Sequence, residues 1–239
     1  GIYVLVGEVI ALSGDHAPIS FLIASLVMLL PAACFAELTG RMPYAAAEAH
    51  FVKAGFNSPT LFLAVGLGVA AVGIVSSSAI AHGAAGYIVE LIDVPYMLVL
   101  AAVIAMTGIV ACFGIRESIL FAGALTLIEV GGLVILVLGA IWSGADLGEQ
   151  AVKSVPTSFS PVLWSGIFAS GLLSFFAFIG FEDIDSIAEE TVNPQKTLAR
   201  GIFLTLGLTL VLYTLVVLAA LATVPVSELS ESRAPLALV

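Results

Sequence analysis

The residues best placed to do chemistry form one stretch, FFAFIGFEDIDSIAEE, which runs from Phe175 to Glu190. Its first part is as apolar as a membrane span, while its second part carries five carboxylates: Glu182, Asp183, Asp185, Glu189 and Glu190. At 100° per residue these carboxylates fall on an arc of about 160°, so we predict an amphipathic helix there. Gly180 separates the two parts, and glycine is the residue at which a helix unwinds most easily.

A helix that breaks inside a membrane frees backbone N–H and C=O groups. Such groups are tolerated at membrane depth only where they are buried in protein or line a cavity. Secondary transporters use them to hold substrates near the bilayer midplane. The sequence therefore predicts a substrate site at a helix break near Gly180. A span that simply ends near Gly180, followed by an acidic loop, is the alternative.

The composition predicts a polytopic α-helical membrane protein. Of the 239 residues, 61% are hydrophobic and 10% are charged, whereas soluble domains are about half apolar and a quarter charged. The net charge of −10 and the lack of a basic patch argue against a nucleic-acid partner. The sequence contains no metal-ligand spacing, nucleophile triad or phosphate loop, so we expect neither an enzyme nor a cofactor.

Apolar runs of membrane-spanning length define the expected organisation. The predicted segments are 19–40, 60–90, 96–113, 118–142, the broken segment 162–190, and 201–223, with 1–12 as the latter half of an earlier helix. Between them we expect polar loops at 41–58, which holds a short interfacial helix at 44–54, and at 143–160 and 191–198. Because both ends lie inside apolar sequence, we expect one transmembrane domain, residues 1–239, truncated at both ends.

The basic residues are distributed unevenly among the loops. Most of them follow the second, fourth and sixth segments: Arg41, Lys53, Arg116, Lys196 and Arg200. The loops after the fifth and seventh segments contribute only Lys153 and Arg233. By the positive-inside rule, the first group of loops should lie in the cytoplasm.

Ionisable residues at membrane depth are functional candidates by default. Glu182, just past the expected break, and Glu129, well inside the fifth segment, both qualify. We interpret His82 as a packed or interhelical residue and not as a proton carrier. Cys34 and Cys112 lie in apolar segments and are interpreted as small packing residues, not as a disulfide.

Three stretches carry a resemblance to a known family: GIYVLVGE, AELTGRMP and FFAFIGFEDIDSIAEETVNPQKTLARGI. They resemble the first helix, the end of the second helix, and the sixth helix with its following loop in the amino acid–polyamine–organocation (APC) transporters. The resemblance implies a leucine-transporter-like fold, an all-α 5+5 inverted repeat that is incomplete here. This chain would hold most of helix one through helix seven.

The resemblance also implies which groups hold the substrate. Gly1 and Ile2 would belong to an unwound segment whose N–H groups meet the substrate carboxylate, an anion that suits a helix N-terminus. The α-ammonium group would be bound by backbone carbonyls of Ala177, Phe178, Ile179 and Gly180.

Four side chains receive roles on the same basis. Phe176 would be an aromatic gate over the substrate, with ordinary packing as the alternative. Ser77 would face the same cavity, unless its hydroxyl bonds back to its own helix. Glu182 would couple protonation to opening, with Glu129 ranked second. The alternative for Glu182 is an acid that merely starts a helix, and the alternative for Glu129 is a buried interhelical hydrogen bond.

This sequence also departs from the family pattern. The family's first-helix glycine motif begins before Gly1. Ala46-Ala47-Glu48 stands where members often have a glycine pair, and Glu129 stands where some members have a lysine. The last difference leaves the coupling ion open.

Together these features predict an amino acid permease, a multi-pass protein of the cell membrane that works by alternating access, coupled to protons or to exchange. Its partners would be an amino acid substrate and the lipid bilayer. A polyamine transporter of the same family and a non-transporting solute sensor are the alternatives. The amino acid and the oligomeric state, a homodimer included, stay open.

Overall fold

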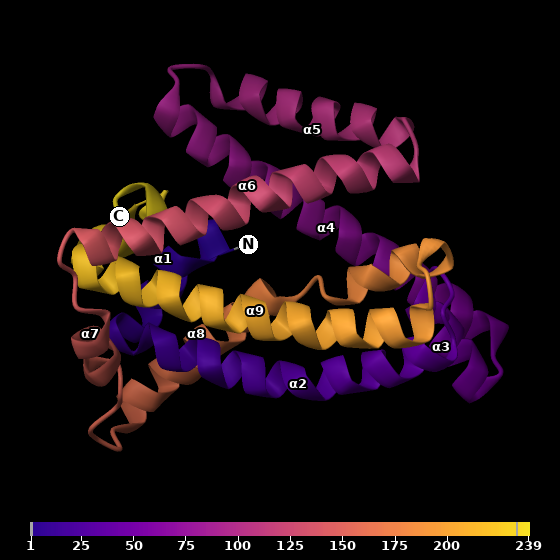
Figure 1. Cartoon of the computed structure of the whole chain (residues 1–239), viewed down its shortest axis with the longest axis horizontal. Coiled ribbons are helices and arrows are strands. Elements are labelled where there is room, and N and C mark those ends of the chain that lie inside the picture. The colour runs from indigo at the N-terminus through magenta and orange to yellow at the C-terminus, as the bar shows by residue number, and fades with distance from the viewer. Residues whose placement is uncertain (1, 233) are drawn as a thin grey trace.

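The computed structural model describes residues 2–232 and 234–239, and in this part of the chain every regular element is a helix (Figure 1). The α-helices are α1 Ile2–Ser13, α2 Ala17–Arg41, α3 Ala47–Phe56, α4 Pro59–Leu91, α5 Tyr96–Cys112, α6 Ile115–Trp142, α7 Leu147–Lys153, α8 Pro161–Phe178, α9 Pro194–Thr223 and α10 Val226–Glu231. Three 3₁₀ helices complete the described part: η1 Gly14–His16, η2 Glu182–Glu190 and η3 Pro235–Ala237.

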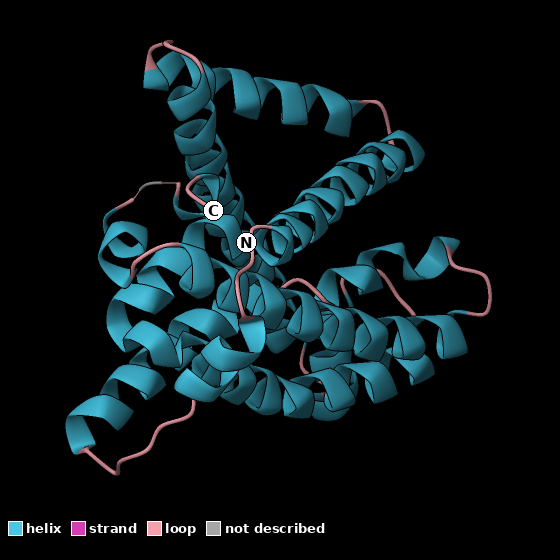
Figure 2. Ribbon diagram, turned by 60° about the vertical axis from the view of Figure 1, so that its left-hand side comes forward, coloured by secondary structure: helices cyan, strands magenta, loops and turns pink. Residues whose placement is uncertain are grey.

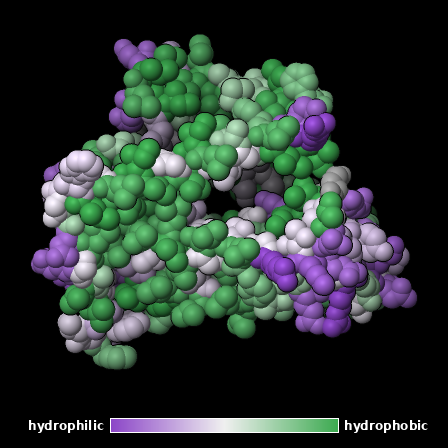
Figure 3. All heavy atoms as spheres, viewed as in Figure 1, coloured by the Kyte–Doolittle hydropathy of each residue, from purple (hydrophilic) through white to green (hydrophobic). Residues whose placement is uncertain are grey.

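Five apolar stretches are long enough to cross a membrane, which confirms a multi-pass membrane protein. They are Ile2–Arg41, Pro59–Leu91, Ile115–Trp142, Pro161–Ile184 and Pro194–Thr223, and α5 adds a shorter apolar helix. Polar residues gather toward the two ends of the molecule, while apolar residues cover most of the face between them (Figure 3). The interfacial helix expected in the 41–58 loop is present as α3.

Two expected loops turn out to contain helix. The 143–160 loop holds α7, whose N-cap Asp146 accepts a hydrogen bond from the Glu149 N–H at 2.9 Å. The predicted 191–198 loop is too long, because α9 already begins at Pro194, a residue preorganised for the first turn of a helix. Lys196 and Arg200 therefore lie on a helix.

The buried core lies among α1, α2, α8 and α9. Gly14, with φ of +54°, lies in the turn between α1 and α2, which run in opposite directions (Figure 1). Buried side chains fill the space between these helices, among them Ile2, Val6, Ile10, Phe21, Ile202 and Leu206.

Buried serines also join two of these helices. The Ser20 hydroxyl on α2 donates to the Ile167 carbonyl of α8 at 3.1 Å and lies 2.6 Å from the Ser170 hydroxyl. Small hydroxyl residues of this kind bring membrane helices into close contact. Apolar packing and these hydrogen bonds together hold α8 against α2.

Helices α4 and α5 and the first half of α6 form an open layer beside this core (Figure 2), whereas the second half of α6 packs on α9, where Leu133, Val137 and Ala140 are buried. Among the described side chains of α4 and α5, only Ala81, Ala85 and Val99 are buried. His82 of α4 lies 2.6 Å from the Tyr96 hydroxyl of α5, which confirms the interhelical interpretation of this histidine. Cys34 and Cys112 are free but exposed, so the interpretation of both as packing residues is wrong.

Candidate functional site

The expected break in the 162–190 segment is present. α8 ends at Phe178, Ile179 is extended with φ −65° and ψ 143°, and Gly180 has φ +117°. A side chain at that φ would be strained, which explains why glycine stands here. The Gly180 N–H donates to the Glu182 carboxylate at 2.9 Å, so it does not continue the α-helical ladder toward Phe176.

The break leaves carbonyl groups available at the end of α8. The last four carbonyls of an α-helix have no partner within the helix, and here they include those of Ala177 and Phe178. The side chains of both residues are buried, at 7% and 3% exposure. Backbone acceptors are therefore present where the sequence predicts the ammonium-binding carbonyls.

The second half of the broken segment differs from the prediction. It is the 3₁₀ helix η2, with non-helical geometry at Ile187, and not the amphipathic α-helix that was expected. A 3₁₀ helix repeats every three residues, which aligns Phe181, Ile184 and Ile187 on one side. Phe181 is buried, and Ile184 packs so closely on α9 that a Cβ at Gly201 would lie 2.6 Å from its Cδ1. Tertiary packing of this apolar row thus takes the place of an α-helical face.

The start of α1 lies at the same level as the break. α1 and α8 are antiparallel, and Gly166 near the start of α8 faces the Leu12 carbonyl near the end of α1, where an added Cβ would be 2.6 Å away. Ile2 lies ten residues before Leu12 along α1, and Phe178, the end of α8, lies twelve residues after Gly166. The free N–H groups of one helix and the free carbonyls of the other therefore lie close in depth, although Ile2 is helical here and not unwound.

Tyr213 of α9 joins these two helix ends, and the sequence analysis missed it. Its hydroxyl lies beside the backbone of Ile2. Its ring packs on Phe178 at 5.9 Å and on Phe21 at 6.2 Å between centroids. The only signal in the sequence was a single tyrosine in the middle of an apolar span.

A second group of polar side chains fastens the start of α1 to the outer layer. The Tyr3 hydroxyl donates to the Glu129 backbone carbonyl of α6 at 2.9 Å, and the Tyr87 hydroxyl of α4 donates to the Tyr3 carbonyl at 2.5 Å. The Glu129 side chain is exposed and lies close enough to act electrostatically on the Tyr3 and Tyr213 phenols. Glu129 thus lies beside the start of α1, whereas Glu182 holds the break itself.

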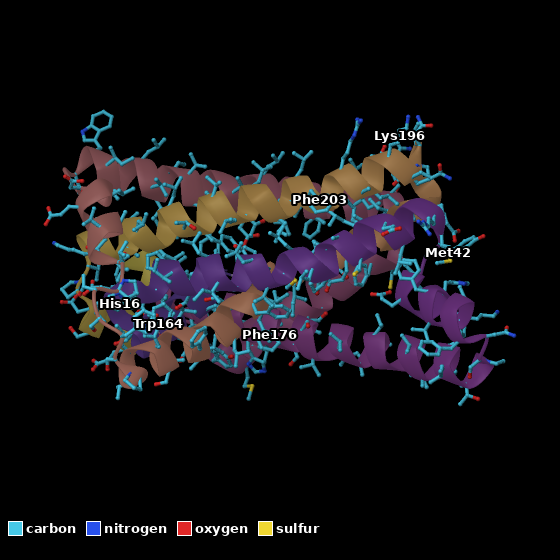
Figure 4. All side chains as sticks on the ribbon, turned by 90° about the horizontal axis from the view of Figure 1, so that it is seen from below. His16, Met42, Trp164, Phe176, Lys196 and Phe203 are labelled. Atoms are coloured by element: carbon cyan, nitrogen blue, oxygen red, sulfur yellow. The ribbon has the colours of Figure 1, made fainter. Side chains whose placement is uncertain are left out.

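The remaining predicted site residues are placed less closely together. Phe176 is 62% exposed and lies about midway between the two ends of the molecule (Figure 4). Its exposure argues against the packing alternative within this chain. Ser77 is exposed on α4, and α4 meets α1 at Gly83 and Tyr87, six and ten residues further on. Gly1 lies outside the described residues.

The loop after α2 contains one departure from the family pattern. Ala46 has φ +55°, a left-handed conformation that favours glycine, and it stands where the resembling family often has one. The neighbouring Ala45 N–H donates to the Glu189 carboxylate of η2 at 3.3 Å. η2 is therefore connected to the α2–α3 loop as well as to α9.

The described residues contain no group of three or more His, Cys, Asp or Glu side chains arranged to hold a metal ion. What the site offers is backbone N–H and C=O groups at two facing helix ends, an exposed aromatic ring and two carboxylates. This arrangement suits a small zwitterion, which carries one anionic and one cationic group.

The chain is similar to known transport proteins. The sequence model of a family described as amino acid permease matches residues 1–239. The vacuolar cationic amino acid transporter 2 of Arabidopsis thaliana is 31% identical over 255 residues, covering 94% of this chain and 38% of the plant protein. The branched-chain amino acid permease BcaP of Bacillus subtilis (strain 168) is 27% identical, and the match covers 100% of this chain and 54% of the bacterial protein.

A mouse protein, cationic amino acid transporter 4, is 28% identical, and the match covers 98% of this chain and 40% of the relative. This chain therefore spans between about two fifths and one half of the length of these relatives.

Proposed function

Because this chain belongs to the amino acid permease family within the APC transporters, we propose that it forms part of a secondary transporter that moves an amino acid across a membrane by alternating access. It is a transporter-family protein and not an enzyme. The observation that carries the proposal is the break after Phe178, which lies level with the start of α1 and is joined to it by Tyr213.

In this proposal the two helix ends bind the two charged groups of the substrate. The first N–H groups of α1, from Gly1 and Ile2 onward, receive the carboxylate, for which a helix N-terminus is suited. Carbonyls from Ala177 to Gly180 receive the α-ammonium group. Phe176 covers the substrate, and Ser77 contributes from α4 when α4 moves toward the core. The whole protein would complete a leucine-transporter-like 5+5 repeat in one transmembrane domain of the cell membrane.

We assign the coupling of protonation to opening first to Glu182. Its carboxylate holds the Gly180 N–H at 2.9 Å, and a protonated carboxyl is a weaker acceptor, so protonation would loosen the break. Glu129 is the second candidate, since it lies beside Tyr3 at the other helix end. A charge at membrane depth is costly for either residue, which makes both functional candidates.

The test is uptake into proteoliposomes by the whole protein that carries this chain. Cationic and branched-chain amino acids are the first two sets to compare, because the relatives' names mention both. Saturable amino acid uptake supports the proposal. Uptake of polyamines alone would favour the polyamine alternative, and binding without uptake would favour a solute sensor.

Coupling is tested separately by the pH profile of uptake. Glu182→Gln should flatten the profile while the substrate still binds, and Glu129→Gln is the matched comparison. A wild-type profile for Glu182→Gln together with a flat one for Glu129→Gln would reverse the ranking. Unchanged profiles for both would end the assignment of proton coupling to these carboxylates.

A further inference from the structure

One face of α9 changes from basic to apolar over its first four turns. Lys196 and Arg200 are exposed near its start, and Phe203, Leu204 and Gly207 follow, also exposed. Their spacing of three, four and seven residues puts them on one side of the helix. Figure 4 shows Lys196 at the same end of the molecule as Met42, with Phe203 nearer the middle.

Lys196 and Arg200 have no partner within the described residues, unlike two other cations of the chain, Arg41 and Lys53. Arg41 forms an ion pair with Glu37 at 2.5 Å, and Lys53 lies over the Phe62 ring, 5.3 Å from its centroid. For Lys196 and Arg200 the described part of the chain provides no such contact. A pair of adjacent unpaired cations is notable in a chain of net charge −10.

The surface next to these cations is hollowed. A shallow, open groove on one side of α9 is bordered by Ala199, Arg200, Phe203 and Leu204. A second groove of about 120 Å³ lies between α9 and α2, where Phe203, Gly207 and Leu210 face Leu26 and Leu29. Phe203 lines both, so the two grooves adjoin along α9.

The length of this surface matches one leaflet of a membrane. Leu210 is ten residues beyond Arg200, or about 15 Å along the helix. The hydrocarbon core of a bilayer is about 30 Å thick, so one leaflet is about 15 Å. A ligand with its charge at Arg200 and its apolar part along the grooves would thus fit within a single leaflet.

We propose that this face of α9 binds an anionic phospholipid of the leaflet on the Lys196 side. The two unpaired cations take the headgroup phosphate, and one acyl chain lies against Phe203 and continues between α2 and α9. Positive charge opposite a phosphate, directly followed by an apolar groove of leaflet length, favours a charged lipid over a neutral one. This site is separate from the proposed substrate site and does not depend on it.

The experiment uses the whole protein that carries this chain, purified and offered equal amounts of phosphatidylglycerol and phosphatidylcholine, with bound lipid measured by native mass spectrometry. The wild type should retain phosphatidylglycerol preferentially. The double variant Lys196→Gln/Arg200→Gln should retain about thirtyfold less phosphatidylglycerol than the wild type, since two membrane-surface cations are removed. The control Lys53→Gln/Arg116→Gln removes the same charge from the same end and should retain the lipid.

A second variant tests the groove without changing charge. Nothing lies within 4 Å of a Cβ added at Gly207, so Gly207→Leu is tolerated by the fold and fills the groove. It should lower phosphatidylglycerol retention, and the soluble headgroup glycerophosphoglycerol should not bind to any form. Equal losses in both double variants, no preference in the wild type, or tight binding of the soluble headgroup would each overturn the proposal. So would a crosslink from Leu204→Cys to another segment of the protein that covers the groove.

Discussion

The bundle of α1, α2, α8 and α9 and the outer layer of α4, α5 and the first half of α6 are equally apolar in sequence but differ in packing. Gly166 in the bundle approaches the Leu12 carbonyl so closely that an added Cβ would lie 2.6 Å from it. In the outer layer, Gly108 and Gly123 have nothing within 4 Å of that position. In a membrane protein, apolar sequence serves lipid contact and helix packing alike, so composition does not separate them.

The difference also separates what each region can do. The bundle fixes the break at Gly180 with an aromatic group and a hydrogen bond, and it contains the predicted binding carbonyls from Ala177 to Gly180. The outer layer touches the start of α1 mainly through Tyr3, Tyr87 and Gly83. Two helices that bury few side chains, α4 and α5, can move beside this packed bundle with little loss of contact.

The largest effect on uptake should come from Gly180→Ala in the bundle. Its φ of +117° forces about 1–3 kcal/mol of strain on any side chain. That strain shifts the local conformation by about tenfold to a hundredfold, so uptake by the whole protein should fall by about tenfold or more. Gly114→Ala is the matched control, because Gly114 has φ +119° but lies between α5 and α6. If Gly114→Ala lowers uptake per folded molecule equally, the site does not depend on the break.

The next effect concerns two phenylalanines on one helix. Phe178→Ala removes a ring that is 3% exposed and should lower the free energy of unfolding by about 3–5 kcal/mol. Phe176 is 62% exposed, so Phe176→Ala should change stability by less than about 0.5 kcal/mol while it weakens substrate binding. Melting temperature and substrate affinity, measured on both variants, check this. A large stability loss at Phe176 would place that ring in the core of the whole protein.

A smaller effect is expected where the helices of the bundle touch. Gly166→Ala places a Cβ against the Leu12 carbonyl and should destabilise the protein by about 1–3 kcal/mol. Gly108→Ala in α5 meets no neighbour and should be neutral or stabilising by up to about 1 kcal/mol. Thermal unfolding of both variants in the same detergent measures the difference. Equal losses would mean that the two regions are packed alike.

The smallest effect tests the connection between the regions. Tyr87→Phe deletes the hydrogen bond to the Tyr3 carbonyl and should cost about 1 kcal/mol. Tyr96→Phe deletes a bond within the outer layer, to His82, and serves as the control. Hydrogen exchange at the start of α1 should rise for Tyr87→Phe only. Faster exchange there in both variants would argue against a specific role for the Tyr87 connection.

The sequence by itself determined the membrane class, most helix bounds and the position of the break. Runs of apolar residues define spans because the bilayer has a fixed thickness. Gly180 between an apolar and an acidic half marks the break because only glycine reaches its φ without strain. These are local properties, and local chemistry is sufficient to predict them.

Only the tertiary structure decided which groups meet. Tyr213 joins α1 and α8 although it is more than thirty residues from Phe178 in the sequence. η2 is a 3₁₀ helix and not an α-helix, and it packs Phe181 into the core and Ile184 against α9. The family resemblance implies one cavity for Ser77 and Phe176. In the structure, however, α4 contacts α1 at Gly83 and Tyr87, which follow Ser77 along the helix, and Ser77 itself is exposed. Such contacts depend on how helices cross, and an evenly apolar helix surface gives no sign of which face will be covered.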